Sequence, residues 1–173
     1  DRSVRILLLA LALLTLAAPQ AAADDGPAFR RTTPRAVLGE RDGWTLLGVP
    51  GGRAWGIESA LRRAPPRPAT LEVELAVADP RVREAFVRVA WYARERGRQR
   101  QLDVVDSDLV VAGERRTVLV PLDPPEGARA YRVRVLARLV TAERSSDDAI
   151  AVGPSRVTSG RLALTRLLWD GPP

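Results

Sequence analysis

Arginine is the residue type in this chain best suited to recognition chemistry, and it recurs in one alternating segment. In GARAYRVRVLARLV, residues 127–140, Arg132, Arg134 and Arg138 alternate with apolar residues. Alternation at period two predicts a β-strand with an apolar face in the core and an arginine face outside. Guanidinium groups bind carboxylate, sulfate or phosphate through paired hydrogen bonds, so this face either recognises an anion or is solvated surface.

A second segment has the same pattern and extends the candidate site. In AFVRVAWYAR, residues 85–94, Arg88 and Tyr92 lie on the parity opposite the apolar residues. If the two strands pair, Arg88 joins Arg132 and Arg134 on one sheet surface. Tyr92 is then the best candidate for an exposed aromatic ring. These four residues are the members of the candidate ligand-binding set that lie on these two strands, and Trp44 and Trp55 are its other two candidates.

The remaining aromatic residues divide between the core and a turn. Trp91 and Tyr131 share parity with aliphatic neighbours, so we expect both to be buried. Trp44 and Trp55 flank the GVPGG turn at 48–52. They either form part of a binding rim that stacks on sugar rings or cap the loop as a structural cluster.

Acidic residues are densest in LDVVDSDLV, residues 102–110. Asp106 and Asp108 could supply oxygen ligands for calcium on a turn. The alternative is that these aspartates cap a solvated β-turn. Calcium is therefore the one cofactor that the sequence leaves open.

Composition argues against catalysis. The chain has no histidine, cysteine or lysine. It therefore lacks the Ser-His-Asp triad, a thiol nucleophile, a histidine zinc site and a Schiff-base lysine. Paired carboxylates remain, but nothing in their spacing selects a glycosidase arrangement. We expect a protein that is not an enzyme and contains no disulfide.

The charge balance gives little information on partners. The 173 residues include 27 basic residues, all arginine, against 21 acidic ones, which gives a net charge of +6. A high isoelectric point follows from the lack of groups that titrate at intermediate pH. No aromatic-studded basic groove is visible in the sequence, so we do not expect nucleic-acid binding.

The first 23 residues are typical of a secretory signal peptide. Arg2 and Arg5 precede an apolar run at 6–18, and Ala21 and Ala23 occupy the small-residue positions of a cleavage site. The run is shorter than the roughly 20 residues that a spanning helix needs. We expect a cleavable signal helix and a mature protein that is secreted or in the cell envelope, without a membrane span.

The rest of the chain reads as strands separated by turns. Segments such as ATLEVELAVAD at 69–79 alternate apolar residues with Glu72 and Glu74, which would pair with arginines on a solvated surface. About nine such strands predict an all-β fold, an antiparallel jelly-roll β-sandwich. The expected organisation is a signal peptide (1–23), an N-terminal extension or first strand (24–36), one β-sandwich domain (37–170) and a tail (171–173).

The order of these features resembles a known family. GW at Gly43-Trp44, TLEVELAVA, VRVAWYARERGRQ, a PPEGA turn and SGRLALTRLLWD follow one another along the chain. In this order they resemble the jelly-roll sandwich of galactose-binding-like domains and related carbohydrate-binding modules, across about residues 37–169. The resemblance implies a sandwich that binds sugars, although such folds also serve as adhesion modules and spacers.

These observations lead to two hypotheses of different classes. The first is a secreted, non-catalytic module that binds an extracellular or cell-surface glycan, with an anionic glycan suited to the arginine face. The alternative is a structural or interaction subunit of an extracellular layer, fibre or envelope complex that contacts another extracellular protein. Leu119, Leu136 and Leu167 have the outward parity and favour this alternative, because exposed apolar patches mark contacts.

Overall fold

Strands make up all the regular structure that is described. A computed structural model of the chain describes residues 24–25, 29–32, 36–49, 55–140 and 143–159. The predicted signal segment 1–23 and the predicted last strand at 160–169 lie outside these residues. Within them, no helix is long and apolar enough to cross a membrane.

In the described part of the chain, thirteen strands form two antiparallel sheets. The six-stranded sheet contains β1 (Asp24–Asp25), β3 (Val37–Arg41), β4 (Trp44–Gly48), β7 (Ala69–Val77), β11 (Arg115–Leu122) and β13 (Ile150–Ser159). The seven-stranded sheet contains β2 (Phe29–Arg31), β5 (Trp55–Ser59), β6 (Arg62–Arg63), β8 (Val82–Glu95), β9 (Arg98–Asp106), β10 (Val110–Val111) and β12 (Ala130–Leu139). The count exceeds the predicted nine because several strands have only two or three residues.

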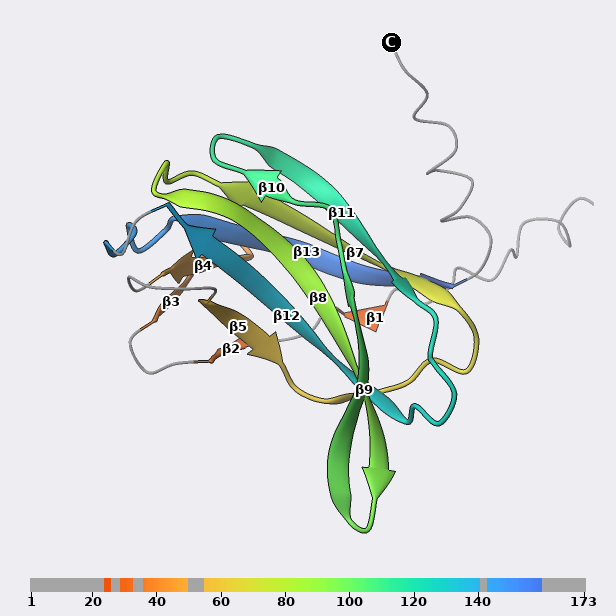
Figure 1. Cartoon of the computed structure of the whole chain (residues 1–173). Coiled ribbons are helices and arrows are strands. Elements are labelled where there is room, and N and C mark those ends of the chain that lie inside the picture. The colour runs from red at the N-terminus through yellow and green to blue at the C-terminus, as the bar shows by residue number, and fades with distance from the viewer. Residues whose placement is uncertain (1–23, 26–28, 33–35, 50–54, 141–142, 160–173) are drawn as a thin grey trace, which may run out of the picture.

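The connectivity is that of a jelly roll, which confirms the predicted fold. The strand order is β11-β7-β13-β4-β3 in one sheet and β10-β8-β12-β5-β2 in the other. From β4 to β8 the chain changes sheet at each long strand, and it does so again through β11, β12 and β13 (Figure 1). Each sheet therefore places strands side by side that are distant in the sequence.

The two inner faces bury one common core. Leu71, Val73 and Leu75 of β7 have no exposed surface, and neither do Val133 and Val135 of β12. These are the residues that period-two alternation places inward, so the predicted strand phase is confirmed. Two buried hydroxyls accept hydrogen bonds from backbone N–H groups of this core. One belongs to Ser145, which accepts the Val49 N–H at 2.8 Å, and the other to Ser59, described below.

Strand β8 is the longest and has two partners along one edge. Its C-terminal part pairs with β9, and its N-terminal part pairs with β10. In the gap between β9 and β10, the Ser107 hydroxyl accepts a hydrogen bond from the Val87 N–H at 3.0 Å. The β8–β9 hairpin projects from the sandwich (Figure 1) and turns at Arg96 and Gly97, both with positive φ. Two such residues are typical of a tight hairpin turn.

Candidate functional site

Strands β8 and β12 lie side by side, and this confirms the predicted arginine face. Arg134 is paired with Arg88, Arg132 with Ala90 and Ala130 with Tyr92 across the two strands. The arginine face, as used below, is the outer surface of the seven-stranded sheet formed by Arg30, Glu58, Glu84, Arg88, Tyr92, Asp106, Arg132, Arg134 and Arg138. The four predicted ligand-binding residues of β8 and β12 therefore share one surface.

One row of charged side chains crosses five strands of this face. Register places Arg30 of β2 opposite Glu58 of β5, Glu58 opposite Arg134 of β12, Arg134 opposite Arg88 of β8, and Arg88 opposite Asp106 of β9. The signs alternate along the row except at Arg134 and Arg88. Like charges directly opposite each other on neighbouring strands repel. The row therefore has one junction at which a negative charge is missing.

Glu58 is the centre of the ion pairs on one side of this junction. Its carboxylate lies 2.9 Å from Arg30 Nη2, 3.1 Å from Arg132 Nη1 and 3.4 Å from Arg134 Nε. Only 15% of its side-chain surface is exposed. Burial by itself raises the pKa of Glu58, but the charges of Arg132 and Arg134 and the hydrogen bond from Arg30 outweigh it, so this pKa lies below its ordinary value. Three guanidinium groups share one ionised carboxylate.

Asp106 holds the arginine on the other side of the junction. Its two oxygens accept hydrogen bonds from Arg88 Nε at 2.6 Å and from Arg88 Nη2 at 2.7 Å. This is a bidentate pair, the geometry that fixes a guanidinium in one orientation. The hydrogen bond to Asp106 holds the pKa of Arg88 above its ordinary value. Arg88 is thus fixed at the edge of the junction.

Tyr92 lies on the arginine face, but the prediction that it is exposed is wrong. It is 9% exposed because Arg132 lies over its ring, with the guanidinium carbon 5.9 Å from the ring centre. Its hydroxyl accepts a hydrogen bond from Arg134 Nη2 at 3.1 Å. Tyr92 therefore positions two arginines and offers no open ring for sugar stacking. The buried Arg132 Nε has no hydrogen-bond acceptor among the described residues.

At the Phe86 end of the arginine face, Arg138 is also paired with a carboxylate. Arg138 Nη1 lies 2.5 Å from Glu84, and Arg88 and Arg138 both lie over the ring of Phe86. In total the arginine face contains five arginines and three carboxylates, an excess of two positive charges. Glu72 and Glu74, which the sequence offered as partners, are on the other sheet and pair with Arg156 and Arg115.

Trp44 does not join this site. Trp44 is on β4 of the six-stranded sheet, where the Arg115 guanidinium carbon lies 4.6 Å from its ring centre. A Cβ at Gly153 would stand 2.8 Å from the Trp44 ring, so the glycine allows the ring to lie against the backbone. Trp55 begins β5, but its side chain lies outside the described part of the structure.

The predicted calcium ligands are directed to arginines instead of to each other. Asp106 is paired with Arg88, and Asp108, 84% exposed, lies 3.7 Å from Arg116. Among the described residues, no group of three or more acidic side chains could hold a metal ion. The calcium hypothesis gains no support from this geometry.

The sequence analysis did not identify Glu58 and Glu84 as members of the site, nor Ser59, which connects β5 to β12. Glu58 and Glu84 form most of the ion pairs of the face, yet neither lies in a cluster of acidic residues that would mark a site in the sequence. The one available signal for Glu58 was the alternation in WGIES, residues 55–59, which directs Glu58 outward and Ser59 inward. Ser59 is fully buried, and its hydroxyl accepts the Val133 N–H at 3.0 Å.

Comparison with known proteins identifies the fold. The sequence matches no protein-family model and no curated protein. Among solved structures, the chain is similar to the family 22 carbohydrate-binding and family 10 modules of the Clostridium thermocellum endo-1,4-β-D-xylanase 10B, complexed with xylohexaose. The TM-score is 0.56 at 12% identity, over 81% of this chain and 28% of that chain.

Two further structures give the same picture. The C-terminal family 22 carbohydrate-binding module of the same xylanase matches with a TM-score of 0.50 and 15% identity, over 75% of this chain and 84% of that module. The enzymatically active domain of bacteriophage CBA120 tailspike protein 4 matches with a TM-score of 0.50 and 12% identity, over 78% of this chain and 19% of that chain. The chain thus spans only a small part of the xylanase and tailspike chains. At these identities the likeness shows a β-sandwich fold shared with carbohydrate-binding modules.

Proposed function

We propose that this protein is a secreted, non-catalytic module that binds an anionic extracellular or cell-surface glycan on the arginine face. The observation that carries the proposal is the junction between Arg134 and Arg88. Register pairs Arg134 with Arg88 across β12 and β8, while Glu58 and Asp106 hold their side chains from the outer sides. A carboxylate or sulfate group placed between them completes the alternation of charge.

The physical argument is one of preorganisation. Ordering a flexible arginine on binding costs about 0.5–1.5 kcal/mol per side chain. Here Asp106 fixes Arg88 through two hydrogen bonds, and Tyr92 and Glu58 fix Arg134. The two side chains are therefore already ordered in the free protein, and binding does not incur this entropy cost again. The excess of two positive charges on the face attracts a polyanion before contact.

The fold and the predicted export favour a glycan over other anions. The sandwich is shared with carbohydrate-binding modules, and the segment 1–23 predicts secretion. An exported module meets acidic polysaccharides more often than nucleic acids. The outer surface of the seven-stranded sheet suits the middle of a polymer chain, because several acidic sugars can meet the row of arginines in turn.

A charge-matched pair of double variants tests the proposal. Arg88→Gln with Arg134→Gln removes the junction, whereas Arg115→Gln with Arg156→Gln removes the same charge from the opposite sheet. Binding to polygalacturonate, with neutral xylan as reference, is measured by affinity electrophoresis and calorimetry at two salt concentrations. We expect the first variant to bind polygalacturonate at least tenfold more weakly and the second to bind within twofold of the parent. Equal weakening in both would refute a site on the arginine face.

The alternative, an interaction subunit of an extracellular assembly, is favoured by a different surface. Leu109 and Val111 are 44% and 43% exposed at the short edge strand β10. Exposed apolar residues on a sheet edge offer a place for another chain to pair. The residues chosen from the sequence for this role fit less well: Leu119 and Leu136 are half-buried, and Leu167 lies outside the described residues. Light scattering that shows a concentration-dependent oligomer, lost in Leu109→Ser with Val111→Thr, would favour this alternative.

A further inference from the structure

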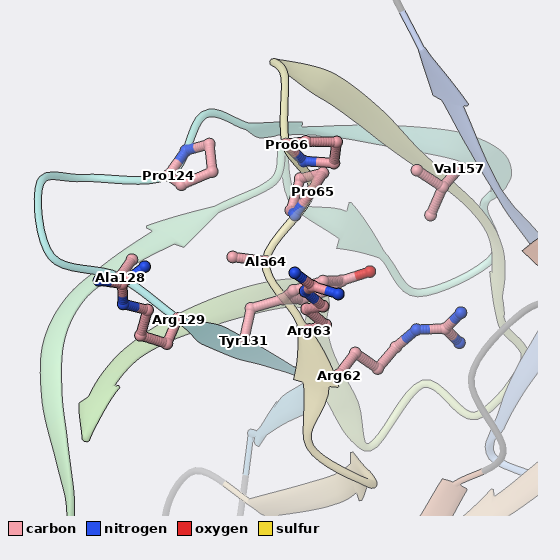
Figure 2. A pocket seen from close by; sticks show the side chains of 10 residues that line it. All are labelled: Arg62, Arg63, Ala64, Pro65, Pro66, Pro124, Ala128, Arg129, Tyr131 and Val157. Carbon is pink, nitrogen blue, oxygen red and sulfur yellow. The ribbon is translucent and has the colours of Figure 1, made fainter.

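A hollow opens at one end of the sandwich, beyond the Tyr92 end of the arginine face. Its volume is about 820 Å³. Tyr131 of β12 and Val157 of β13 line it from the two sheets, and Arg63 of β6 and the prolines of two loops form the rest of its wall (Figure 2). We call it the end pocket. None of the residues that define the arginine face lines it.

The wall of the end pocket is held by backbone hydrogen bonds. The Ala64 N–H donates to the Arg129 carbonyl at 3.0 Å, and the Arg129 N–H donates to the Tyr92 carbonyl at 2.9 Å. Pro65, Pro66 and Pro124 are among the lining residues, and proline has a fixed φ. The pocket is therefore preformed and loses little conformational entropy when a ligand enters.

Charge distinguishes this pocket from the arginine face. Arg62, Arg63 and Arg129 line it, and no acidic residue is among the described residues that do so. On the arginine face every arginine has a carboxylate partner. The Arg63 and Arg129 side chains, in contrast, form no ion pair or hydrogen bond with the described residues. They are cations with unused donors among the residues that line the hollow.

The remaining lining indicates what else the ligand must contain. Ala64, Ala128, Val157 and the three prolines present carbon atoms, and the Tyr131 ring, 3% exposed, lies at the wall that adjoins the core. The volume falls within the roughly 300–1,000 Å³ of small-molecule sites. A ligand that fits has one anionic group for the guanidinium forks and a compact body with C–H faces for the apolar wall.

We propose that the end pocket is a second binding site, which takes a small carboxylated saccharide such as a uronic acid. A pyranose ring offers C–H faces to the prolines, and its carboxylate pairs with one of the two guanidinium groups of Arg63 and Arg129, which lie apart from each other (Figure 2). The ligand is either a free acidic sugar or the end of an acidic polysaccharide, because both present the same group. The site acts independently of the arginine face, which binds the middle of a polymer.

Nuclear magnetic resonance titration of the whole protein tests this site directly. The probes are D-glucuronate, D-glucose as the neutral analogue, acetate as a bare carboxylate, and an oligogalacturonide for the polymer end. We expect glucuronate to produce saturable shifts of the Ala64 and Ala128 amides, at least tenfold tighter than acetate, with no response to glucose. Stronger binding of the oligogalacturonide than of the monomer identifies a polymer end as the source, and equal binding identifies the free sugar.

Variants separate the pocket from its surroundings. Arg63→Gln with Arg129→Gln should abolish the glucuronate shifts without lowering the thermal midpoint, because neither side chain has a partner among the described residues. The charge-matched control is Arg94→Gln with Arg98→Gln, two exposed residues of the β8–β9 hairpin that do not line the pocket. The control should bind as the parent does.

Three results would overturn the inference. They are the absence of saturable pocket shifts with glucuronate, equal shifts with glucose, and equal loss of binding in the hairpin control. A failure of this kind leaves polygalacturonate binding by the arginine face intact, since that binding depends on Arg88 and Arg134. Conversely, loss of glucuronate binding in the Arg88→Gln, Arg134→Gln variant would assign the sugar to the arginine face and refute a separate pocket.

Discussion

Glu58→Gln should destabilise the protein and strengthen its binding of an anionic polymer. The substitution keeps the shape of the side chain and removes its charge. Glu58 contacts Arg30, Arg132 and Arg134 within 3.4 Å and is only 15% exposed. Exposed ion pairs contribute about 0.2–1 kcal/mol each, and breaking buried ones costs more. For three half-buried pairs we expect a loss of about 2 kcal/mol in the free energy of unfolding.

The gain in binding comes from removing a repulsive charge. An anion seated between Arg134 and Arg88 lies about one and a half strand spacings from the Glu58 carboxylate, roughly 7 Å. Two like charges at this distance repel by about 0.6 kcal/mol in water and about 2.4 kcal/mol at the dielectric of a protein surface. We expect a net gain on the order of 1 kcal/mol, which corresponds to about fivefold tighter binding of polygalacturonate.

Glu74→Gln is the matched control for this experiment. It also removes one negative charge from an outward strand position, but on the opposite sheet, where Glu74 has Arg115 as its partner. The two outer faces are separated by more than the sheet spacing of about 10 Å, which is also about one Debye length at 0.1 M salt. We expect affinity within a factor of two of the parent and stability within about 1 kcal/mol. Urea unfolding and calorimetry measure both quantities. If Glu58→Gln bound no better than Glu74→Gln, the ligand would not lie at the junction, and unchanged stability would show that the ion pairs do not form in solution.

Four further outcomes follow from the structure. Val133→Asp places an unpaired charge at a fully buried position and should cost on the order of 5 kcal/mol, so that no cooperative thermal transition remains, whereas retention of one would contradict the strand phase. Ser59→Ala leaves the Val133 N–H without its acceptor and should lower the free energy of urea unfolding by about 1–3 kcal/mol. Hydrogen bonds from Arg81 hold the pKa of Asp79 well below its ordinary 3.8, so the stability that ionised Asp79 contributes is present above pH 3.8 and is lost as the pH falls below it. Asp79→Asn should therefore lower the thermal midpoint at pH 7 and make that midpoint less dependent on pH in the acid range. N-terminal sequencing of exported protein should begin at or near Asp24, and an intact residue 2–18 segment on the product would contradict export by cleavage.

Local patterns were sufficient to predict the strands and their phase. Alternation is a property of neighbouring residues, and the buried face of β7 or β12 can be read without knowing what it packs against. The pairing of β8 with β12 followed from the jelly-roll resemblance. For these reasons Arg88, Arg132 and Arg134 were correctly expected on one surface.

The errors arose where a residue depends on a partner distant in the sequence. Glu58 and Arg134 are 76 positions apart in the sequence, and no spacing in the sequence predicts that they pair. Tyr92 has the outward parity, but arginines from β12 cover it, so parity alone overestimated its exposure. Trp44 is close to Trp55 in sequence, yet β4 and β5 belong to different sheets.

The position of β13 has a consequence for how the chain reaches this structure. β13 lies in the middle of the six-stranded sheet, between β7 and β4, and pairs Val152 with Thr45 more than a hundred residues earlier. Until residues 150–159 are available, β4 has no partner on that side and the sheet consists of two unconnected halves. Closing such distant contacts is slow, because the entropy of a long loop is lost before the contacts form. The six-stranded sheet therefore cannot close until the chain through β13 is available.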